Sequence, residues 1–348
     1  MAGINQHFIP QSLLRRFGHK KTGKATRVAV YEQGNVFVTA TTGAAAQRYF
    51  YSKLSQDGER TLDDKITDYE PRLAALFAEL DSAASGSVVD VEAPSELIAH
   101  LCIRNAQVRE SFGHISGQLL GGALEMFTDP KKRWQLMGLD KSEPSDLLLE
   151  EFNKAYDAAG LALRGMPRDQ FLELCFASAK IQFNPSAPNP LPEFDAFAAA
   201  AREMAPTLAK DGHGRALERG LVPEARRAAL RALTWRVYDT NFDLVLPDCI
   251  AIDWPTPGHC RAFVYAPNPE LTHVVMPIAS RRYLVGACDE RTHDASEINR
   301  AFAQCSWRFF IARDRADSFE ILISEIGKVT RAWADREIED ALAKVQIP

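Results

Sequence analysis

The sequence has no apolar run long enough to cross a membrane. Its longest apolar runs, such as residues 73–78 and 196–201, fall far short of the roughly 18 residues that a membrane span requires. The first residues also lack the apolar segment of a secretory signal peptide. With 46% hydrophobic and 25% charged residues in a chain of 348, the composition is that of a folded globular protein. We therefore expect a cytoplasmic protein that does not bind membranes.

Several common chemical signatures are also missing. The six cysteines occur singly and form no C-x-x-C pair, so the sequence contains neither a zinc knuckle nor a redox dithiol motif. There is no G-x-S-x-G, G-x-x-x-x-G-K-S/T or G-x-G-x-x-G motif, which argues against a serine hydrolase elbow, a P-loop and a dinucleotide-binding turn. Candidate chemistry must therefore come from less standard residue clusters.

Acidic residues slightly outnumber basic ones, 46 to 41, and the positive charge is unevenly distributed. The net charge of -5 argues against a protein coated in basic surface. Residues 1–31 nevertheless contain six basic residues and no acidic one, and residues 215–236 contain six arginines against two glutamates. These stretches could attract phosphate groups. Solvated helix faces that pair with acidic helices elsewhere would explain them equally well.

The first elements of the chain are predicted from side-chain periodicity. Valines alternate with other residues over 27–39 around Gln33-Gly34, which predicts a β-hairpin. Helical periodicity then dominates roughly residues 60–232, and Thr61-x-x-Asp64 predicts a capping-box-like start of its first helix, with Asp in place of the usual Glu or Gln. Within it we expect a break or kink at Pro71 and one long helix over about residues 95–120.

From residue 232 onward, short proline-punctuated strands replace the helical pattern. A strand hairpin, a long helical middle and then further strands favour an α+β fold over an alternating α/β fold. We expect one α+β domain over residues 1–312, in which the N-terminal hairpin and the mainly antiparallel C-terminal strands share or flank one sheet. Terminal helices over residues 313–348 would form an extension.

The N-terminal segment is the part of the sequence that packing explains least. Asn5-Gln6-His7-Phe8-Ile9-Pro10 runs into Leu13-Leu14-Arg15-Arg16-Phe17, which combines a titratable ring, a fixed φ and two cations in a short stretch. The motif N-Q-H-F-I-P-Q-x-x-L-R-x-F resembles the opening signature of the bacterial domain-of-unknown-function family 4238.

Further positions carry this resemblance through about residues 4–312. Tyr49-Phe50-Tyr51 is similar to the family's Phe-Tyr segment, and Glu70 and Arg104 fall in helices where the family carries Glu and often Arg. At residues 246–248 the chain departs from the family, which tends to place Asp before Pro, because it has Leu-Pro-Asp. The resemblance implies an intracellular bacterial protein and leaves the activity open.

The first candidate site combines His7 with Arg15 and Arg16. The imidazole could act as a general acid or base while the guanidinium groups bind phosphate. The alternative is a structural role, in which His7 hydrogen bonds within its turn while the neighbouring apolar residues anchor the segment. With the family match, we weigh the functional interpretation more heavily.

The second candidate site is a polar stripe on the helix expected over residues 95–120. His100, Arg104 and His114 belong to a series at helical spacing, which would place two imidazoles and a guanidinium on one face. Such a set suffices for metal-free phosphodiester cleavage. A merely solvated helix face is the more common explanation of this pattern.

A metal site is the third possibility. Glu70, with nearby Asp63, Asp64 and Asp68, could bind a divalent ion together with His7, although carboxylates in a first helical turn also complement the helix dipole. We leave the identity of any cofactor open, with a divalent metal as the candidate.

These clusters lead to one working hypothesis and one alternative. The hypothesis is a nuclease-like or nucleic-acid-processing hydrolase, such as a toxin or phage-defence effector, with nucleic acid as its partner. His7, Glu70 and Arg104 would be catalytic, and substrate or phosphate would contact the following residues: Asn5, Arg15, Arg16, Tyr51, His100 and His114. The alternative is a non-catalytic binding protein in which the N-terminal motif is structural. The oligomeric state is not predicted.

Overall fold

A computed structural model of the chain describes residues 4–20, 25–52, 59–186, 192–256, 258–266, 271–289 and 297–343. The chain forms two compact units, which we describe separately. Unit 1 comprises residues 1–112 and 209–336, and unit 2 comprises residues 113–208 and 337–348. The helical middle expected from the sequence is therefore divided between the two units. The single domain expected over residues 1–312 stays a prediction.

The N-terminal hairpin is present in unit 1. Strands β3 (Thr26–Glu32) and β4 (Asn35–Ala40) pair antiparallel around a turn in which Gly34 has a φ of +81°. The hairpin belongs to a sheet in the order β2-β3-β13-β8, in which β4 also pairs with β3. The other strands of this sheet are β2 (His19–Lys20), β8 (Leu246–Pro247) and β13 (Phe309–Ala312). The first and last thirds of the sequence thus meet in one antiparallel ladder.

The remaining C-terminal strands form a second, six-stranded sheet with the order β10-β9-β11-β12-β7-β6. Its pairs are all antiparallel. Its strands are β6 (Val88–Val89), β7 (Thr234–Asp239), β9 (Ile252–Thr256), β10 (His259–Ala262), β11 (His273–Ala279) and β12 (Arg282–Ala287). Beyond β10 the chain continues as a 3-10 turn, η2 (Phe263–Tyr265).

The expected α+β fold, with an N-terminal hairpin and mainly antiparallel C-terminal strands, is therefore confirmed, and the strands are divided between two sheets. Only β8 and β13 join the hairpin, whereas the others form the six-stranded sheet. The reason is α10 (Ile298–Cys305), which lies between β12 and β13 in the chain and contacts strands of both sheets. Its apolar residues, including Phe302 with no exposed area, are covered by both sheets rather than by one.

The first long helix of unit 1 begins where the sequence predicts. The Thr61 and Asp64 side chains form a reciprocal capping box at the start of α2 (Leu62–Ser82). The break considered at Pro71 does not occur, because the helix continues to Ser82. Pro71 lacks an N–H for the carbonyl of Thr67, and Thr67 is exposed, so water can replace the lost donor.

The long helix expected over residues 95–120 is instead two helices. The structure has α3 (Glu92–Ile103) and α4 (Ala106–Thr128), with the break at Arg104 and Asn105. The Asn105 side chain accepts a hydrogen bond from the Val108 N–H and donates one to the carbonyl of Cys249. A buried asparagine thus starts a new helix and ties it to the β8–β9 connection.

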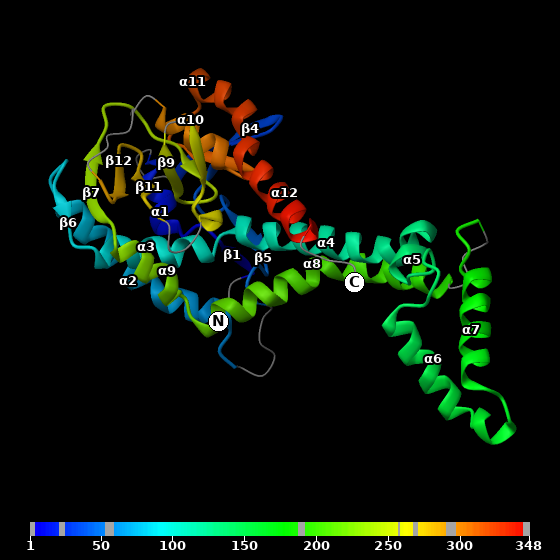
Figure 1. Cartoon of the computed structure of the whole chain (residues 1–348). Helices are drawn as coiled ribbons and strands as arrows, with labels where there is room; N and C mark the ends of the chain where they lie inside the picture. The colour runs from blue at the N-terminus through cyan, green and yellow to red at the C-terminus, as the bar shows by residue number, and fades with distance from the viewer. Residues whose placement is uncertain are drawn as a thin grey trace. The chain divides into compact units, whose positions relative to one another are not determined.

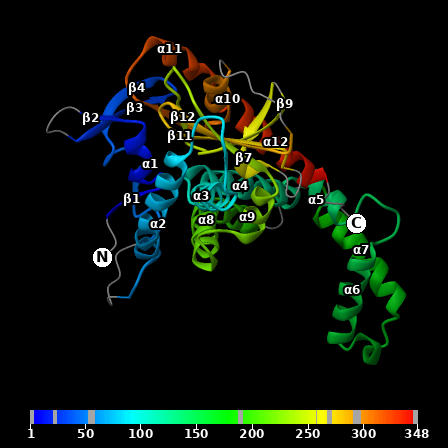
Figure 2. The same ribbon diagram turned by 90° about the vertical axis from the view of Figure 1, so that its left-hand side faces the viewer.

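The remaining helices of unit 1 support this frame. Helix α2 packs against α3, and α3 packs against α9 (Glu224–Arg231). Figure 1 labels the elements of unit 1, and the turned view of Figure 2 shows β1, α1 (Gln11–Arg16) and α2 together at one side of this unit. The chain ends with α11 (Asp317–Glu320), η3 (Ile321–Glu325) and α12 (Lys328–Ala343), as expected for terminal helices.

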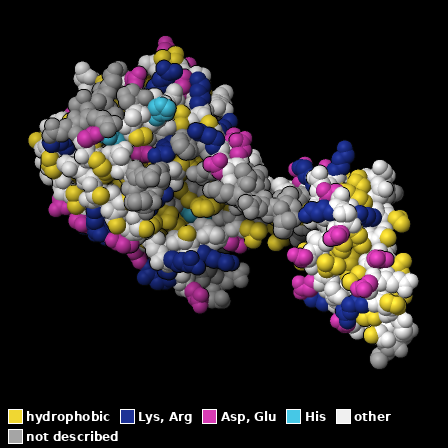
Figure 3. Space-filling model, in the orientation of Figure 1, with side chains coloured by type: hydrophobic (Ala, Val, Ile, Leu, Met, Phe, Trp, Pro, Cys, Tyr) yellow, Lys and Arg dark blue, Asp and Glu magenta, His cyan; other side chains and the backbone are white. Residues whose placement is uncertain are grey.

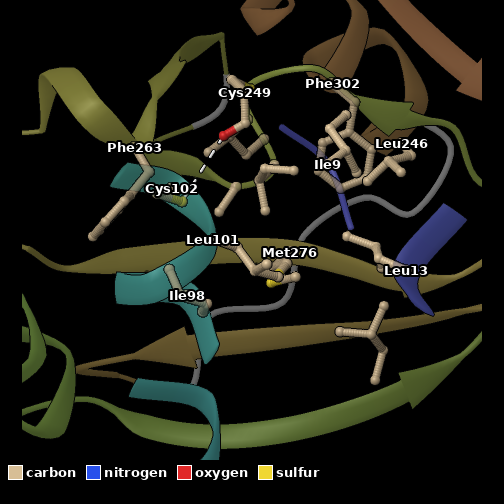
Figure 4. Close-up of a cluster of buried hydrophobic side chains, with 14 of the residues drawn as sticks. Ile9, Leu13, Ile98, Leu101, Cys102, Leu246, Cys249, Phe263, Met276 and Phe302 are labelled. Atoms are coloured by element: carbon tan, nitrogen blue, oxygen red, sulfur yellow. Dashed lines mark hydrogen bonds between the residues drawn. The ribbon is translucent and has the colours of Figure 1, made fainter. Parts of the chain in front are cut away.

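The hydrophobic core of unit 1 includes the apolar residues of the N-terminal motif. Figure 4 shows Ile9 and Leu13 beside residues from distant segments, including Leu246, Met276 and Phe302. All five side chains are fully buried. Packing therefore explains the apolar half of the motif.

Unit 2 contains a much smaller core. It comprises the helices α5 (Pro130–Leu136), α6 (Asp146–Ala158), α7 (Arg168–Gln182), a 3-10 turn η1 (Leu161–Arg164), most of α4 and the first part of α8 (Pro192–Arg219). Leu139, Phe176 and Ala179 are its buried apolar cluster. The proline-rich sequence of residues 184–192 predicts a loop, and part of this segment lies outside the described residues. In the described part of the chain, no helix is long and apolar enough to cross a membrane.

Candidate functional site

A pocket of about 440 Å³ lies in unit 1, which we call the N-terminal pocket. It is bounded by the start of the chain, helix α2 and the end of α3. Its lining residues are Asn5, Gln6, His7, Gln11, Ser12, Arg15, Asp63, Ile66, Thr67, Glu70 and Arg104. His7, Glu70, Arg104, Arg15 and Asn5 were singled out from the sequence, and the fold brings all five together. Their roles stay predictions.

One wall of the pocket is a small two-stranded ribbon. Strand β1 (Asn5–His7) pairs antiparallel with β5 (Ala46–Arg48), and Gln6 anchors the ribbon to the chain that follows. The Gln6 Oε1 accepts hydrogen bonds from the N–H groups of Tyr51 and Ser52, and its Nε2 donates to the carbonyl of Ser52 at 2.8 Å. This buried amide holds the ribbon in place.

The hydrogen bonds of His7 define its tautomer. Its Nδ1 lies 3.1 Å from the carbonyl of Ala44, so Nδ1 carries the proton and donates it. Its Nε2 lies 2.9 Å from the Gln11 Nε2 and accepts from that amide. Gln11 in turn accepts a hydrogen bond from Arg15 at 2.8 Å. His7 is therefore a neutral imidazole, and its basic Nε2 faces the Gln11 amide, which a ligand could displace.

The electrostatic environment keeps His7 in this neutral form. Burial lowers the pKa of His7 below its ordinary 6.5, and the positive charges of Arg104 and Arg15 lower it further. The Ala44 carbonyl and the Glu70 carboxylate oppose this shift. At neutral pH the ring is therefore able to accept a proton.

Arg104 is the buried centre of the network below the pocket. Its Nη2 donates to the carbonyl of His7 at 2.9 Å, its Nε donates to the hydroxyl of Tyr51 at 3.2 Å, and its Nη1 lies 3.2 Å from the Glu70 carboxylate. Its side chain is only 2% exposed. Burial opposes the charge, but Tyr51 and Glu70 raise the pKa of the guanidinium above its usual value. Arg104 therefore binds β1, the segment after β5 and α2 together.

Tyr51 is another buried member of this network. Its hydroxyl donates toward the carbonyls of His7 and Arg104 at 3.2 and 3.0 Å and accepts from the Arg104 Nε. Burial raises the pKa of Tyr51, so the hydroxyl stays protonated. Tyr51 positions the ribbon and does not line the N-terminal pocket.

Glu70 and Arg15 are the charged side chains that face solvent. The Glu70 side chain is 33% exposed and accepts a long hydrogen bond of 3.4 Å from Ser12. Arg15 is exposed, and among the described residues it forms a hydrogen bond with Gln11 and no ion pair. An exposed, unneutralised guanidinium at the rim of a pocket is suited to binding an anion.

The other basic residues are largely committed elsewhere. Arg16 does not line the N-terminal pocket; it pairs with Asp81 and lies over the ring of Phe77 at 4.8 Å. In the second basic stretch, Arg227 and Arg231 pair with Glu92. Figure 3 shows Lys and Arg side chains interspersed with Asp and Glu on the visible face of unit 1. In the second stretch, Arg227 and Arg231 thus form the ion pairs with an acidic helix residue that the alternative interpretation expects, and phosphate binding stays a prediction.

The polar stripe expected on one long helix is not formed, because that helix is interrupted at Asn105. His100 is fully buried, donates from Nδ1 to the carbonyl of Leu221 and stacks on Tyr69. Burial lowers the pKa of His100 to about 3, so it remains neutral below Arg104. His114 belongs to the part of α4 in unit 2 and contacts Gln118. The predicted pair of imidazoles on one helix face is therefore wrong.

Of the four carboxylates in the predicted metal site, two line the N-terminal pocket. Asp63 and Glu70 both line the pocket, but Asp64 caps α2 and Asp68 pairs with Arg60. Over the described ranges, no group of three or more His, Cys, Asp and Glu side chains is arranged to hold a metal ion. The metal interpretation stays an untested prediction.

Sequence reasoning missed several residues of this region. Arg109 is paired with the His213 ring at 3.1 Å and stacks over Phe50 at 3.6 Å, although 104 positions separate Arg109 and His213. Asp248, for which no role is predicted, accepts hydrogen bonds from the backbone N–H groups of Trp307, Arg308 and Phe309. The one sequence feature that pointed to Asp248 is its position beside Pro247, where the chain departs from the family that it resembles.

No curated protein and no solved structure significantly matches this chain. A family model described as a protein of unknown function (DUF4238) matches residues 5–139, which include β1, α1, α2, α3 and every residue that lines the N-terminal pocket. The points of resemblance beyond residue 139 lie outside this match and stay predictions. Residues 5–139 thus form a region of the DUF4238 family, as the N-terminal motif predicts.

Proposed function

We propose that the N-terminal pocket binds a phosphodiester of a nucleic acid and hydrolyses it, with His7 as the general base. The observation that carries this proposal is the pairing of two features in one pocket. One is a neutral imidazole whose basic Nε2 is held only by the Gln11 amide, and the other is the exposed guanidinium of Arg15. A base beside an anion-binding cation is the minimum set for phosphoryl transfer to water or to a hydroxyl.

In this proposal each residue of the pocket has a specific role. The attacking oxygen replaces the Gln11 amide at the Nε2 of His7, gives its proton to that nitrogen and bonds to phosphorus. The P–O bond to the leaving oxygen breaks, and that oxygen takes a proton from water. Arg15 binds the phosphate oxygens and stabilises their increased charge in the transition state. Arg104 is a positioning residue, because its side chain is buried and already bonded to His7, Tyr51 and Glu70. Glu70 holds Arg104 in place.

The test is cleavage of RNA and DNA oligonucleotides by the purified protein, with and without EDTA. The key variant is His7→Asn, because its side-chain amide can still donate to the Ala44 carbonyl while the Nε2 base is removed. We expect activity to fall by about 10²- to 10⁴-fold with an almost unchanged melting temperature. The control is Arg27→Gln in β3, outside the pocket.

Two outcomes would contradict the proposal. Inert wild-type protein on both nucleic acids, with a cooperative folding transition, excludes the nuclease. If His7→Asn unfolds the protein, the motif is architectural and the non-catalytic alternative is favoured. A role as a toxin or phage-defence effector in the bacterial cytoplasm is the biological setting we propose. It predicts that expression of the wild type, and not of His7→Asn, arrests bacterial growth.

A further inference from the structure

A second pocket, of about 260 Å³, uses the other part of the ribbon formed by β1 and β5. His7 lines the N-terminal pocket, whereas Ala46, its partner across the ribbon, lines this second one. We call it the Gln107 pocket. Its lining residues are Phe8, Val30, Glu32, Phe37, Gly43, Ala44, Ala45, Ala46, Gln47, Ala106, Gln107, Glu110, Asp248, Trp307, Arg308 and Phe309.

The unusual feature of this pocket is the side chain of Gln107. The residue is only 1% exposed, yet neither its Oε1 nor its Nε2 has a hydrogen-bond partner among the described residues. Native proteins rarely leave both atoms of a buried amide without partners, because each lost hydrogen bond to water costs free energy. A ligand that presents a donor and an acceptor side by side would satisfy both atoms.

The surroundings of Gln107 indicate which ligand this is. Aromatic rings from separate segments line the pocket, among them Phe8, Phe37 and Trp307. The indole N–H of Trp307 hydrogen bonds with the Glu110 carboxylate, which fixes the ring. Rings that line a pocket favour a ligand with a flat π face, as in the binding of nucleobases.

The pocket is also built rigidly. Three successive backbone N–H groups, of residues 307–309, donate to the buried carboxylate of Asp248 at 2.7 to 3.2 Å. Glu110 pairs with Arg308 at 3.0 Å. Ala45, at the ribbon, has a φ of +47°, a conformation that costs energy in a residue other than glycine and recurs at ligand sites.

We infer that the Gln107 pocket binds a single nucleobase, through a pair of hydrogen bonds to the Gln107 amide and contact with the aromatic rings. All four bases have adjacent donor and acceptor groups, and a glutamine amide pairs with such an edge. The volume lies just below the range of about 300 to 1,000 Å³ for drug-sized ligands, which suits one base. This inference rests on the proposed nucleic-acid substrate for its choice of ligand.

The experiment is calorimetric titration of the full chain with adenosine, guanosine, cytidine and uridine, which carry a base and no phosphate. We expect at least one nucleoside to bind, and Gln107→Met to weaken that binding about 10- to 100-fold. Because methionine fills similar space without unpaired polar atoms, Gln107→Met should melt at the same temperature as the wild type or higher. Gln118→Met, on the same helix, is the control.

The outcomes separate this inference from the proposed function. Binding of a nucleoside that His7→Asn retains and Gln107→Met loses supports the Gln107 pocket, whether or not nucleic acid is cleaved. Binding of no nucleoside, or equal binding by Gln107→Met, overturns the inference even if the nuclease is real. N-methylacetamide has the same donor and acceptor without a ring; if it binds better than every nucleoside, the assigned ligand is wrong.

Discussion

The N-terminal pocket and the Gln107 pocket differ in how the fold treats the polar side chains at their bases. Arg104 and Gln107 are three positions apart, at the junction of α3 and α4, and both are about 1% exposed. The guanidinium of Arg104 is bonded to His7, Tyr51 and Glu70, whereas the amide of Gln107 has no partner among the described residues. The buried polar side chain thus stabilises the structure at the N-terminal pocket, whereas at the Gln107 pocket its hydrogen-bonding groups are available to a ligand.

The largest expected effect comes from removing the network of the first pocket. Arg104→Met removes the hydrogen bonds that the buried guanidinium donates to the Glu70 carboxylate, the His7 carbonyl and the Tyr51 hydroxyl. We expect the free energy of unfolding to fall by about 3 to 5 kcal/mol, measured by urea denaturation. Gln107→Met should instead gain about 1 kcal/mol, because it removes an unsatisfied amide.

Exposed Arg15→Met is the control for lost charge and should change the free energy of unfolding by less than about 0.5 kcal/mol. Equal destabilisation by Arg104→Met and Gln107→Met would remove the distinction between the two pockets.

An intermediate effect is expected when the pH is varied. The buried histidines and the buried Asp248 change the free energy of unfolding with opposite signs. Burial lowers the pKa of His100 to about 3 and that of His213 to about 4, so below pH 6.5 the unfolded chain binds protons that the folded chain does not. Stability is then lost as pH falls, by roughly 1.4 kcal/mol per histidine and pH unit. Burial raises the pKa of Asp248 to about 7. Its contribution to the free energy of unfolding is therefore lost as pH rises from about 3.8 to 7.

This difference is measurable as a slope. Between pH 4.5 and 6.5, Asp248→Asn should make the free energy of unfolding rise more steeply with pH than in the wild type, by about 1.4 kcal/mol per pH unit. The slope is informative even if the variant is less stable, because three backbone N–H groups lose a carboxylate partner. Parallel pH profiles for the two proteins would show that Asp248 does not retain its proton in the folded state.

The smallest expected effect is on the titration of His7, followed by NMR of its ring. Arg15 lowers the pKa of His7 and Glu70 raises it, so Arg15→Gln should raise this pKa and Glu70→Gln should lower it. Both shifts should be small, because solvent screens charges this close to the surface. Arg27→Gln should leave the titration unchanged. Shifts in the same direction for both variants would mean that these side chains act through structure rather than charge.

How far the sequence could predict these features depends on whether the interactions are local. The hairpin around Gln33-Gly34 and the capping box of Thr61 and Asp64 were predictable, because neighbours in the chain make them. The break at Asn105 was not, because its side chain bonds to the Cys249 carbonyl, which is 144 positions away. That single contact removes the predicted polar stripe of His100 and His114.

The same distinction holds for the candidate site. The N-terminal motif indicates His7 and Arg15 as site residues. No motif indicates Gln107, which becomes a candidate only because its buried amide has no hydrogen-bond partner among the described residues. Likewise the sequence predicts a catalytic role for Arg104, and only the structure shows that its donors are already used within the protein.

The sequence by itself determined the α+β class, the hairpin, the capping of α2 and the family of residues 5–139, because periodicity, turn chemistry and a local motif are written in consecutive residues. Tertiary structure alone decided that the strands divide into two sheets and that His7 is neutral. It also decided which buried side chain, Arg104 or Gln107, finds its partners inside the protein. Burial and long-range hydrogen bonds control these outcomes, and both depend on residues that only folding brings together.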